Sequence, residues 1–193
     1  MAQTATAAFT PTTGTTTNYV IRNVETGQFL RCDENKHPNW AAYFSSTIDD
    51  DHFLWQFSPS GSGWKIYNVG RRKYLNDDAT LDGSHTYRGK TDKDGDVWYI
   101  IANTWNKNGY LVSSSDITTA TTATKCLYAY KSSDTYYYLC STGEETADLN
   151  PHGSSDYYHL PTFQFYTYDQ LYDLAKKCGY TGKEVSSPTL NDW

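Results

Sequence analysis

Residues 55–75 read WQFSPSGSGWKIYNVGRRKYL, a pattern of two strands and the start of a third, joined by two turns. This stretch aligns without a gap to residues 19–30, which read YVIRNVETGQFL. Asn23 matches Asn68 in this alignment, 45 residues later. A match at a fixed period indicates that one supersecondary unit has been copied along the chain.

We expect three copies of this unit, at about residues 19–57, 64–101 and 109–166. The third copy is more diverged, and its first strand is assigned to the stretch that follows Gly109. Aligning residues 101–103 with 66–68 instead would leave the second copy without a closing strand. Three units of four strands give the twelve strands of a β-trefoil, a six-stranded barrel closed by three hairpins, which leaves no exposed sheet edge. The predicted interior positions are Ile21, Leu30, Phe57, Ile66, Leu75, Ile100, Leu127 and Phe165.

The two ends of the chain differ from the repeats. Residues 1–18 are rich in Thr and Ala and predict a disordered lead-in, and Ala2-Gln3 is typical of the residues left after a secretory signal is cut. Residues 168–179 carry apolar side chains at helical spacing between an Asp and a Gly, which predicts a short helix. The remainder of 169–193 is expected to be a tail or linker.

Composition and charge argue against several classes of partner. The net charge is −6, and the single basic run, Arg71-Arg72-Lys73, lies in a predicted hairpin turn, so a nucleic-acid partner is not expected. No stretch approaches the roughly 18 apolar residues of a membrane span. Asp92, Asp94 and Asp96 loosely resemble a calcium loop but lack its bidentate Glu, which favours an ordinary turn.

Catalytic and metal-binding patterns are also missing from the sequence. The five histidines are scattered without metal-ligand spacing, and there is no Gly-x-Ser-x-Gly elbow or Cys with a catalytic sequence around it. Nothing marks a pair of carboxylates for glycoside hydrolysis. We therefore expect no cofactor, no metal and no enzymatic activity.

The repeat resembles the ricin-type β-trefoil lectin family over residues 19–168. The resemblance rests on the second-strand triplets Lys73-Tyr74-Leu75 and Lys125-Cys126-Leu127 and on closing triplets such as Trp55-Gln56-Phe57, which stand where the family has Gln-x-Trp. It implies a carbohydrate-binding β-trefoil. Members of this family often bond a Cys in the second strand to one ending the third.

Cys126 and Cys140 occupy those two slots. Both are seven residues from Ser133, so a hairpin centred there would place them opposite each other, within disulfide reach. Such a bridge implies an oxidising compartment and a secreted or cell-surface protein. Cys32 and Cys178 carry no comparable argument and are candidates for buried thiols.

The resemblance also implies shallow sugar pockets, each with an Asp directly after the second strand, an aromatic on the third strand and a nearby amide. This chain departs from that pattern, because Arg31, Asn76 and Tyr128 stand where the Asp is expected. The candidate carbohydrate-binding residues are Asp33, Asn35, Trp40 and Tyr43 in the first copy, and Asn76, Asp77 and Tyr87 in the second. Each Asp has an alternative role as a turn former, and Trp40 has one in covering the barrel.

These observations predict a non-catalytic carbohydrate-binding module of a secreted or surface bacterial protein, which tethers that protein to a glycan or polysaccharide. The alternative is a β-trefoil protein-binding module or protease inhibitor without a sugar site. The missing Asp residues and the long insertion at 143–156 favour this alternative, whereas the surviving pairs of Asp and aromatic residues favour sugar. Solvent exposure of Trp40 and Tyr87 would separate the two.

Overall fold

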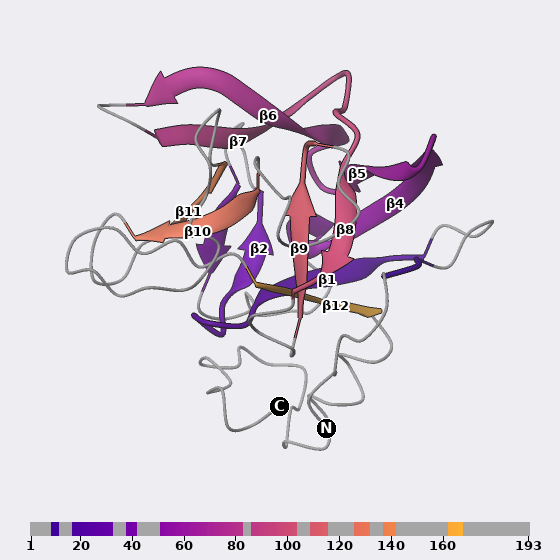
Figure 1. Cartoon of the computed structure of the whole chain (residues 1–193), viewed down its shortest axis with the longest axis horizontal. Helices are drawn as coiled ribbons and strands as arrows, with labels where there is room; N and C mark the ends of the chain where they lie inside the picture. The colour runs from indigo at the N-terminus through magenta and orange to yellow at the C-terminus, as the bar shows by residue number, and fades with distance from the viewer. Residues whose placement is uncertain are drawn as a thin grey trace.

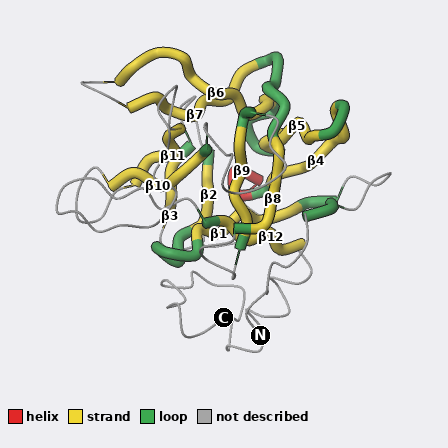
Figure 2. The backbone as a smooth tube through the Cα atoms, viewed as in Figure 1, coloured by secondary structure: helices red, strands yellow, loops and turns green. Residues whose placement is uncertain are grey.

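The computed structural model describes residues 9–11, 17–32, 38–41, 51–82, 86–103, 109–115, 126–131, 137–141 and 162–167. Strands make up almost all the regular structure of this part, with one short 3-10 turn, η1 (Asp51–Phe53) (Figure 2). The first copy contains β1 (Tyr19–Asn23), β2 (Phe29–Arg31), β3 (Asn39–Ala41) and β4 (Trp55–Ser60). The second contains β5 (Gly63–Asn68), β6 (Lys73–Asp82), β7 (Thr86–Asp92) and β8 (Tyr99–Ala102). The third contains β9 (Tyr110–Ser113), β10 (Leu127–Lys131), β11 (Tyr137–Ser141) and β12 (Phe163–Thr167).

The first and fourth strands of each copy form a closed six-stranded barrel (Figure 1). Antiparallel ladders join β4 to β5, β8 to β9, and β12 to β1. Within each copy the first strand also meets the fourth at one residue pair. These three pairs are Tyr19 with Trp55, Trp64 with Trp98, and Tyr110 with Phe163. The recurrence of this contact confirms the predicted β-trefoil.

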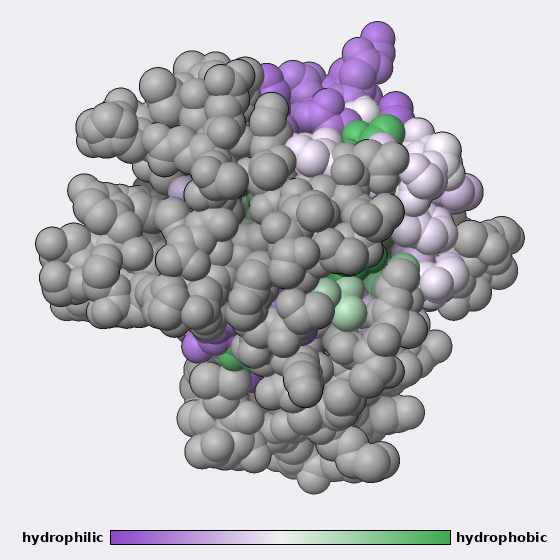
Figure 3. Space-filling model, in the orientation of Figure 1, coloured by the Kyte–Doolittle hydropathy of each residue, from purple (hydrophilic) through white to green (hydrophobic). Residues whose placement is uncertain are grey.

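The second and third strands of each copy form the hairpins β2–β3, β6–β7 and β10–β11. Strand β11 pairs with both β3 and β7, so the hairpins of the three copies adjoin one another. On the face shown in the space-filling view, the described residues are mostly hydrophilic or of intermediate hydropathy, and hydrophobic residues show only in small areas (Figure 3).

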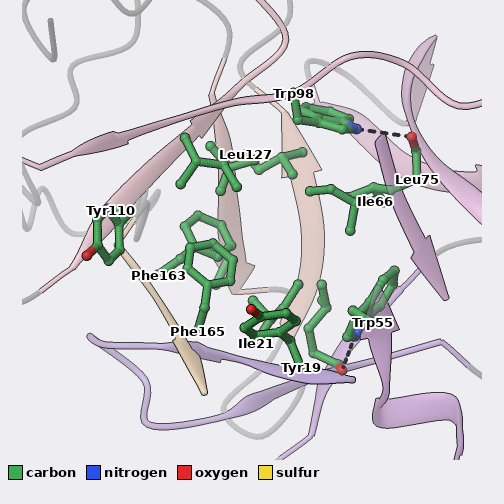
Figure 4. Close-up of a cluster of buried hydrophobic side chains, with 14 of the residues drawn as sticks. Tyr19, Ile21, Trp55, Ile66, Leu75, Trp98, Tyr110, Leu127, Phe163 and Phe165 are labelled. Carbon is green, nitrogen blue, oxygen red and sulfur yellow. Dashed lines mark hydrogen bonds between the residues drawn. The ribbon is translucent and has the colours of Figure 1, made fainter. Parts of the chain in front are cut away.

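Seven of the eight predicted interior residues are buried, and the eighth, Phe57, is partly buried against the same cluster (Figure 4). The cluster also contains Trp55 and Trp98, each with 0% of its surface exposed. Each indole N–H donates to a main-chain oxygen of its own copy, Trp55 to Leu30 and Trp98 to Leu75, both at 3.0 Å. The barrel therefore encloses two polar N–H groups without leaving either unpaired.

The repeated Asn of the first strand holds the turn that follows it. Asn23 and Asn68 are both fully buried, and each side-chain oxygen accepts a main-chain N–H three residues later at 2.9 Å. The next residue in each turn has a left-handed backbone, with φ of 71° at Gly27 and 55° at Arg72. This turn explains why the Asn recurs at a spacing of 45 residues.

Phe9 departs from the expectation of a disordered lead-in over residues 1–18. Its ring stacks on Phe165 with centroids 4.4 Å apart, and it also contacts Tyr19, Phe57 and Tyr110 at 5.6–5.7 Å. One apolar residue in a polar segment was too weak a pattern to predict this contact. The helix expected over 168–179, with the tail to 193 and the insertion at 143–156, lies outside the described residues, and nothing described supports the helix.

The predicted Cys126–Cys140 disulfide is not present, and the hairpin register explains why. Cys140 lies opposite Tyr128, two residues beyond Cys126. Such diagonal neighbours have Cα atoms roughly 7–8 Å apart, beyond the usual reach of a disulfide. Cys126 is instead a buried thiol next to Ser113, with which it forms an isolated bridge between strands. Centring the hairpin on Ser133 was wrong by one residue.

Candidate functional site

Asp77 lies on β6 where the strand changes register. It pairs with Gly89 on β7, but the next pair joins Leu81 to Tyr87, so β6 carries extra residues between the two pairs. An irregularity of this kind bends the strand and redirects its side chains. Asp77 is on the same face of β6 as the buried Leu75, yet it is only half-buried.

Two hydrogen bonds join Asp77 to other segments of the chain. Its main-chain N–H donates to Oδ2 of Asp96 at 2.7 Å, and its own Oδ2 accepts a hydrogen bond from the Ser114 hydroxyl at 3.0 Å. Asp96 precedes β8 and is exposed, whereas Ser114 follows β9 in the third copy. The three residues form a polar cluster between the second and third copies, which we call the Asp77 cluster.

The described residues at the equivalent positions of the other copies, two for Asp77 and one for Asp96, are apolar and buried. Cys32 precedes Asp77 by the 45-residue period, and Ala129 follows its strand triplet as Asp77 does; both have 0% exposure. Phe53, two residues before Trp55, stands where Asp96 precedes Trp98, and it is 1% exposed under the guanidinium of Arg31. Among the described residues, only the second copy has a polar group here.

Asn76 and Tyr87, predicted to act with Asp77, have different places. Asn76 is on the opposite face of β6, because neighbouring residues of a strand alternate. It is 7% exposed, and its amide donates to the main-chain oxygen of Tyr74 at 3.1 Å, so it is not part of the cluster. Tyr87 pairs through its main chain with Leu81 on β6, and its side chain is outside the described atoms.

Of the two aromatic residues predicted for the site in the first copy, the structure describes Trp40 and buries it. Trp40 is 2% exposed, and its ring lies 5.6 Å from that of Phe163, so it presents no face to a ligand. The cause is its pairing with Leu30, since residues directly opposite each other point to the same face of the sheet. Asp33, Asn35 and Tyr43 lie outside the described residues.

The sequence did not indicate Asp96 and Ser114 as site residues. Asp96 belongs to the Asp-rich run that we interpreted as a turn. Ser114 comes from a different copy, and only the fold brings it to Asp77. No cluster of three or more His, Cys, Asp or Glu side chains in the described ranges could hold a metal ion. No described helix is long and apolar enough to cross a membrane.

The fold is similar to that of solved lectins. A Macrolepiota procera ricin B-like lectin, solved in complex with lactose, superposes with a TM-score of 0.55 at 15% identity, covering 80% of this chain and 98% of that one. The Rhizoctonia solani agglutinin gives a TM-score of 0.49 at 14% identity, covering 79% and 99%. No family model matches the chain, and no curated protein does. The chain thus has the ricin-type β-trefoil fold.

Proposed function

We propose that this chain is a non-catalytic, lectin-like carbohydrate-binding module whose working site is the Asp77 cluster. The observation that carries the proposal is the contrast between copies: Asp77 and Asp96 are polar and reach solvent where the first copy buries Cys32 and Phe53. A carboxylate in such a position is unnecessary for folding, since the other copies fill it with apolar side chains.

The chemistry of the cluster suits a ligand with hydroxyl groups. A carboxylate offers about four lone-pair sites, and the Ser114 hydroxyl takes one of those on Asp77. Asp96 supplies a second, exposed acceptor next to it. Tyr87, which lies on β7 just before the register change, is our proposed stacking residue for the sugar ring. Lactose, the ligand of the Macrolepiota procera lectin, is the natural first probe.

The biological role that we propose is tethering of a larger secreted or surface bacterial protein to glycans. A single shallow site gives weak binding, and attachment to a polymer would raise it through multivalency. The proposed secreted or cell-surface location is not supported by a Cys126–Cys140 disulfide, because Cys126 is a thiol. It rests on the resemblance to the lectin family alone.

A glycan array tests the proposal directly, with lactose included among the probes. The wild-type chain would be compared with Asp77→Ala and with Asp33→Ala, the change at the carboxylate that the sequence suggested for the first copy, after thermal melts establish that all three fold. We expect defined glycans to be bound by the wild type and by Asp33→Ala, and lost in Asp77→Ala. Wild-type binding that survives Asp77→Ala would overturn the assignment of the site.

A protein-binding or protease-inhibitor module is the second candidate, and one observation favours it. The first and third copies have the buried residues Cys32 and Ala129 where the second copy has Asp77. Neither copy therefore has a carboxylate at the position that we propose for sugar recognition. An array with no bound glycan, followed by capture of a defined protein ligand in a pull-down, would establish this alternative.

A further inference from the structure

A second group of side chains lies on the outer face of β6, away from Asp77. Gln56 on β4 pairs with Tyr67 on β5, Tyr67 with Tyr74 on β6, and Tyr74 with Asp92 on β7. Residues directly opposite each other across neighbouring strands point to the same face of a sheet. These four side chains therefore form one line across four strands, which we call the tyrosine row.

The two rings of the row are held in place. Their centroids lie 5.0 Å apart at an interplanar angle of 60°, and the ammonium of Lys65 lies 5.9 Å from the Tyr74 ring centre. On the other side, a Cβ at Gly95 would come within 2.5 Å of the Tyr74 Cβ, so the turn backbone packs directly on this residue. Both tyrosines remain half-buried rather than buried.

The threefold repeat shows that this row is unusual in being open. The equivalent row between the third and first copies is Gln164, Arg22 and Phe29, with exposures of 3%, 4% and 0%. The equivalent row between the second and third copies is Tyr99, Ser113 and Cys126, of which the last two are at 0%. The two equivalent rows are thus largely buried, whereas the tyrosine row is accessible to solvent.

The chemistry of the tyrosine row selects its ligand. The half-buried phenol rings offer apolar surface to the C–H side of sugar rings, while Lys65 supplies a donor and Asp92 an acceptor beside them. The Gln56 amide, at the end of the row, donates to the Asn18 side chain at 2.8 Å. The charges at its edges are of both signs, which suits a neutral polyhydroxyl chain. Three strand spacings give the row a length of about 14 Å, more than a single sugar ring occupies.

We propose that the tyrosine row is a second glycan-binding surface, which takes an extended segment of a neutral polysaccharide. This inference rests on the proposed function and extends it to a separate part of the second copy. Tyr74 and Asp77 point to opposite faces of β6, so the row is not a continuation of the Asp77 cluster. A polymer that engages both sites gains avidity, whereas a disaccharide such as lactose can use only one at a time.

Affinity electrophoresis in native gels cast with soluble galactan, xylan or arabinan tests this surface, alongside titration with lactose. The variants are Tyr67→Ala, Tyr74→Ala and Tyr67→Leu, the last of which keeps apolar bulk but lacks a flat ring. Tyr99→Ala is the matched control, since Tyr99 is also a half-buried strand tyrosine. Thermal melts identify any variant that does not fold.

We expect the folded tyrosine-row variants to bind the retarding polysaccharide about tenfold more weakly, through lost avidity, with lactose binding unchanged. Asp77→Ala should lose lactose binding and keep residual retardation by the polymer. If the row variants run like the wild type while Asp77→Ala loses all retardation, the second surface is refuted and the proposed function stands. If the wild type binds neither the polymers nor lactose, and the glycan array is also blank, both proposals fail.

Discussion

The indole nitrogen of Trp98 donates a hydrogen bond to the main-chain oxygen of Leu75 at 3.0 Å, which ties the fourth strand of the second copy to its second strand (Figure 4). Trp55 and Leu30 are joined in the same way at the same distance. In the third copy Phe163 takes this place and has no N–H to donate. The bond is therefore a feature of the two better-preserved copies.

Trp98→Phe should lower the free energy of unfolding by about 2 kcal/mol, since it removes a buried hydrogen bond and leaves a small cavity. Urea denaturation measures the change. Tyr99→Phe, which changes a half-buried neighbour, should stay within about 0.5 kcal/mol of the wild type. Equal stability of Trp98→Phe and the wild type would show that the bond contributes nothing.

Arg72→Gly should stabilise the protein by roughly 0.5–1 kcal/mol, because Arg72 holds a left-handed backbone that costs a non-glycine residue energy. The matched change, Gly27→Ala, places a side chain in the equivalent turn and should destabilise by a similar amount. Thermal and urea melts measure both. Destabilisation by Arg72→Gly would indicate that the arginine side chain makes contacts worth more than the backbone strain.

Phe9→Ala should reduce the free energy of unfolding by about 2–3 kcal/mol, since the ring packs against four aromatic side chains at the end of the barrel. Phe9→Leu should retain part of that stability. A chain that melts at the wild-type temperature after Phe9→Ala would refute the anchoring role of this residue.

Burial raises the pKa of the Cys126 thiol from 9.0 to about 12, against a smaller opposing effect of the hydrogen bond with Ser113. Between these values the folded state retains a proton that the unfolded state releases, so stability should fall as the pH rises from 9 towards 12. We expect urea melts of Cys126→Ala at pH 8 to 10.5 to show a shallower decline than the wild type.

The same burial predicts that Cys126 resists alkylation in the native protein and reacts only after unfolding. Peptide mapping by mass spectrometry under non-reducing conditions measures this. A peptide pair linking Cys126 to Cys140 would contradict the register of the β10–β11 hairpin and restore the disulfide that the sequence suggested.

The sequence repeat was sufficient to predict most of the fold. Ile21 and Ile66 share a period because both face the barrel core, and Asn23 and Asn68 share it because both hold the same turn. Local patterns of this kind reflect backbone geometry, which every copy must satisfy. The position of Phe9 reflects tertiary packing instead, and no repeat marks it.

The candidate site was harder to predict, because it depends on differences between copies. Asp33 and Asp77 looked equivalent, yet the residue 45 positions before Asp77 is Cys32. Trp40 is an aromatic residue of the kind that stacks on sugar rings. Only its pairing with Leu30 shows that its side chain faces the core. A shift of one residue in strand register moves each side chain to the other face of the sheet, and the sequence alone does not determine that register.

The most direct test of the central claim is a calorimetric titration of the wild type and Asp77→Asn with the strongest glycan found on the array. Asp77→Asn keeps the shape of the side chain and removes its charge, and Asp94→Asn makes the same change at an exposed control position. We predict at least about tenfold weaker binding for Asp77→Asn, since a charged hydrogen bond is worth roughly 1.5–3 kcal/mol. Asp94→Asn should bind like the wild type. Unchanged affinity in Asp77→Asn would contradict the claim that the second copy binds glycans through Asp77.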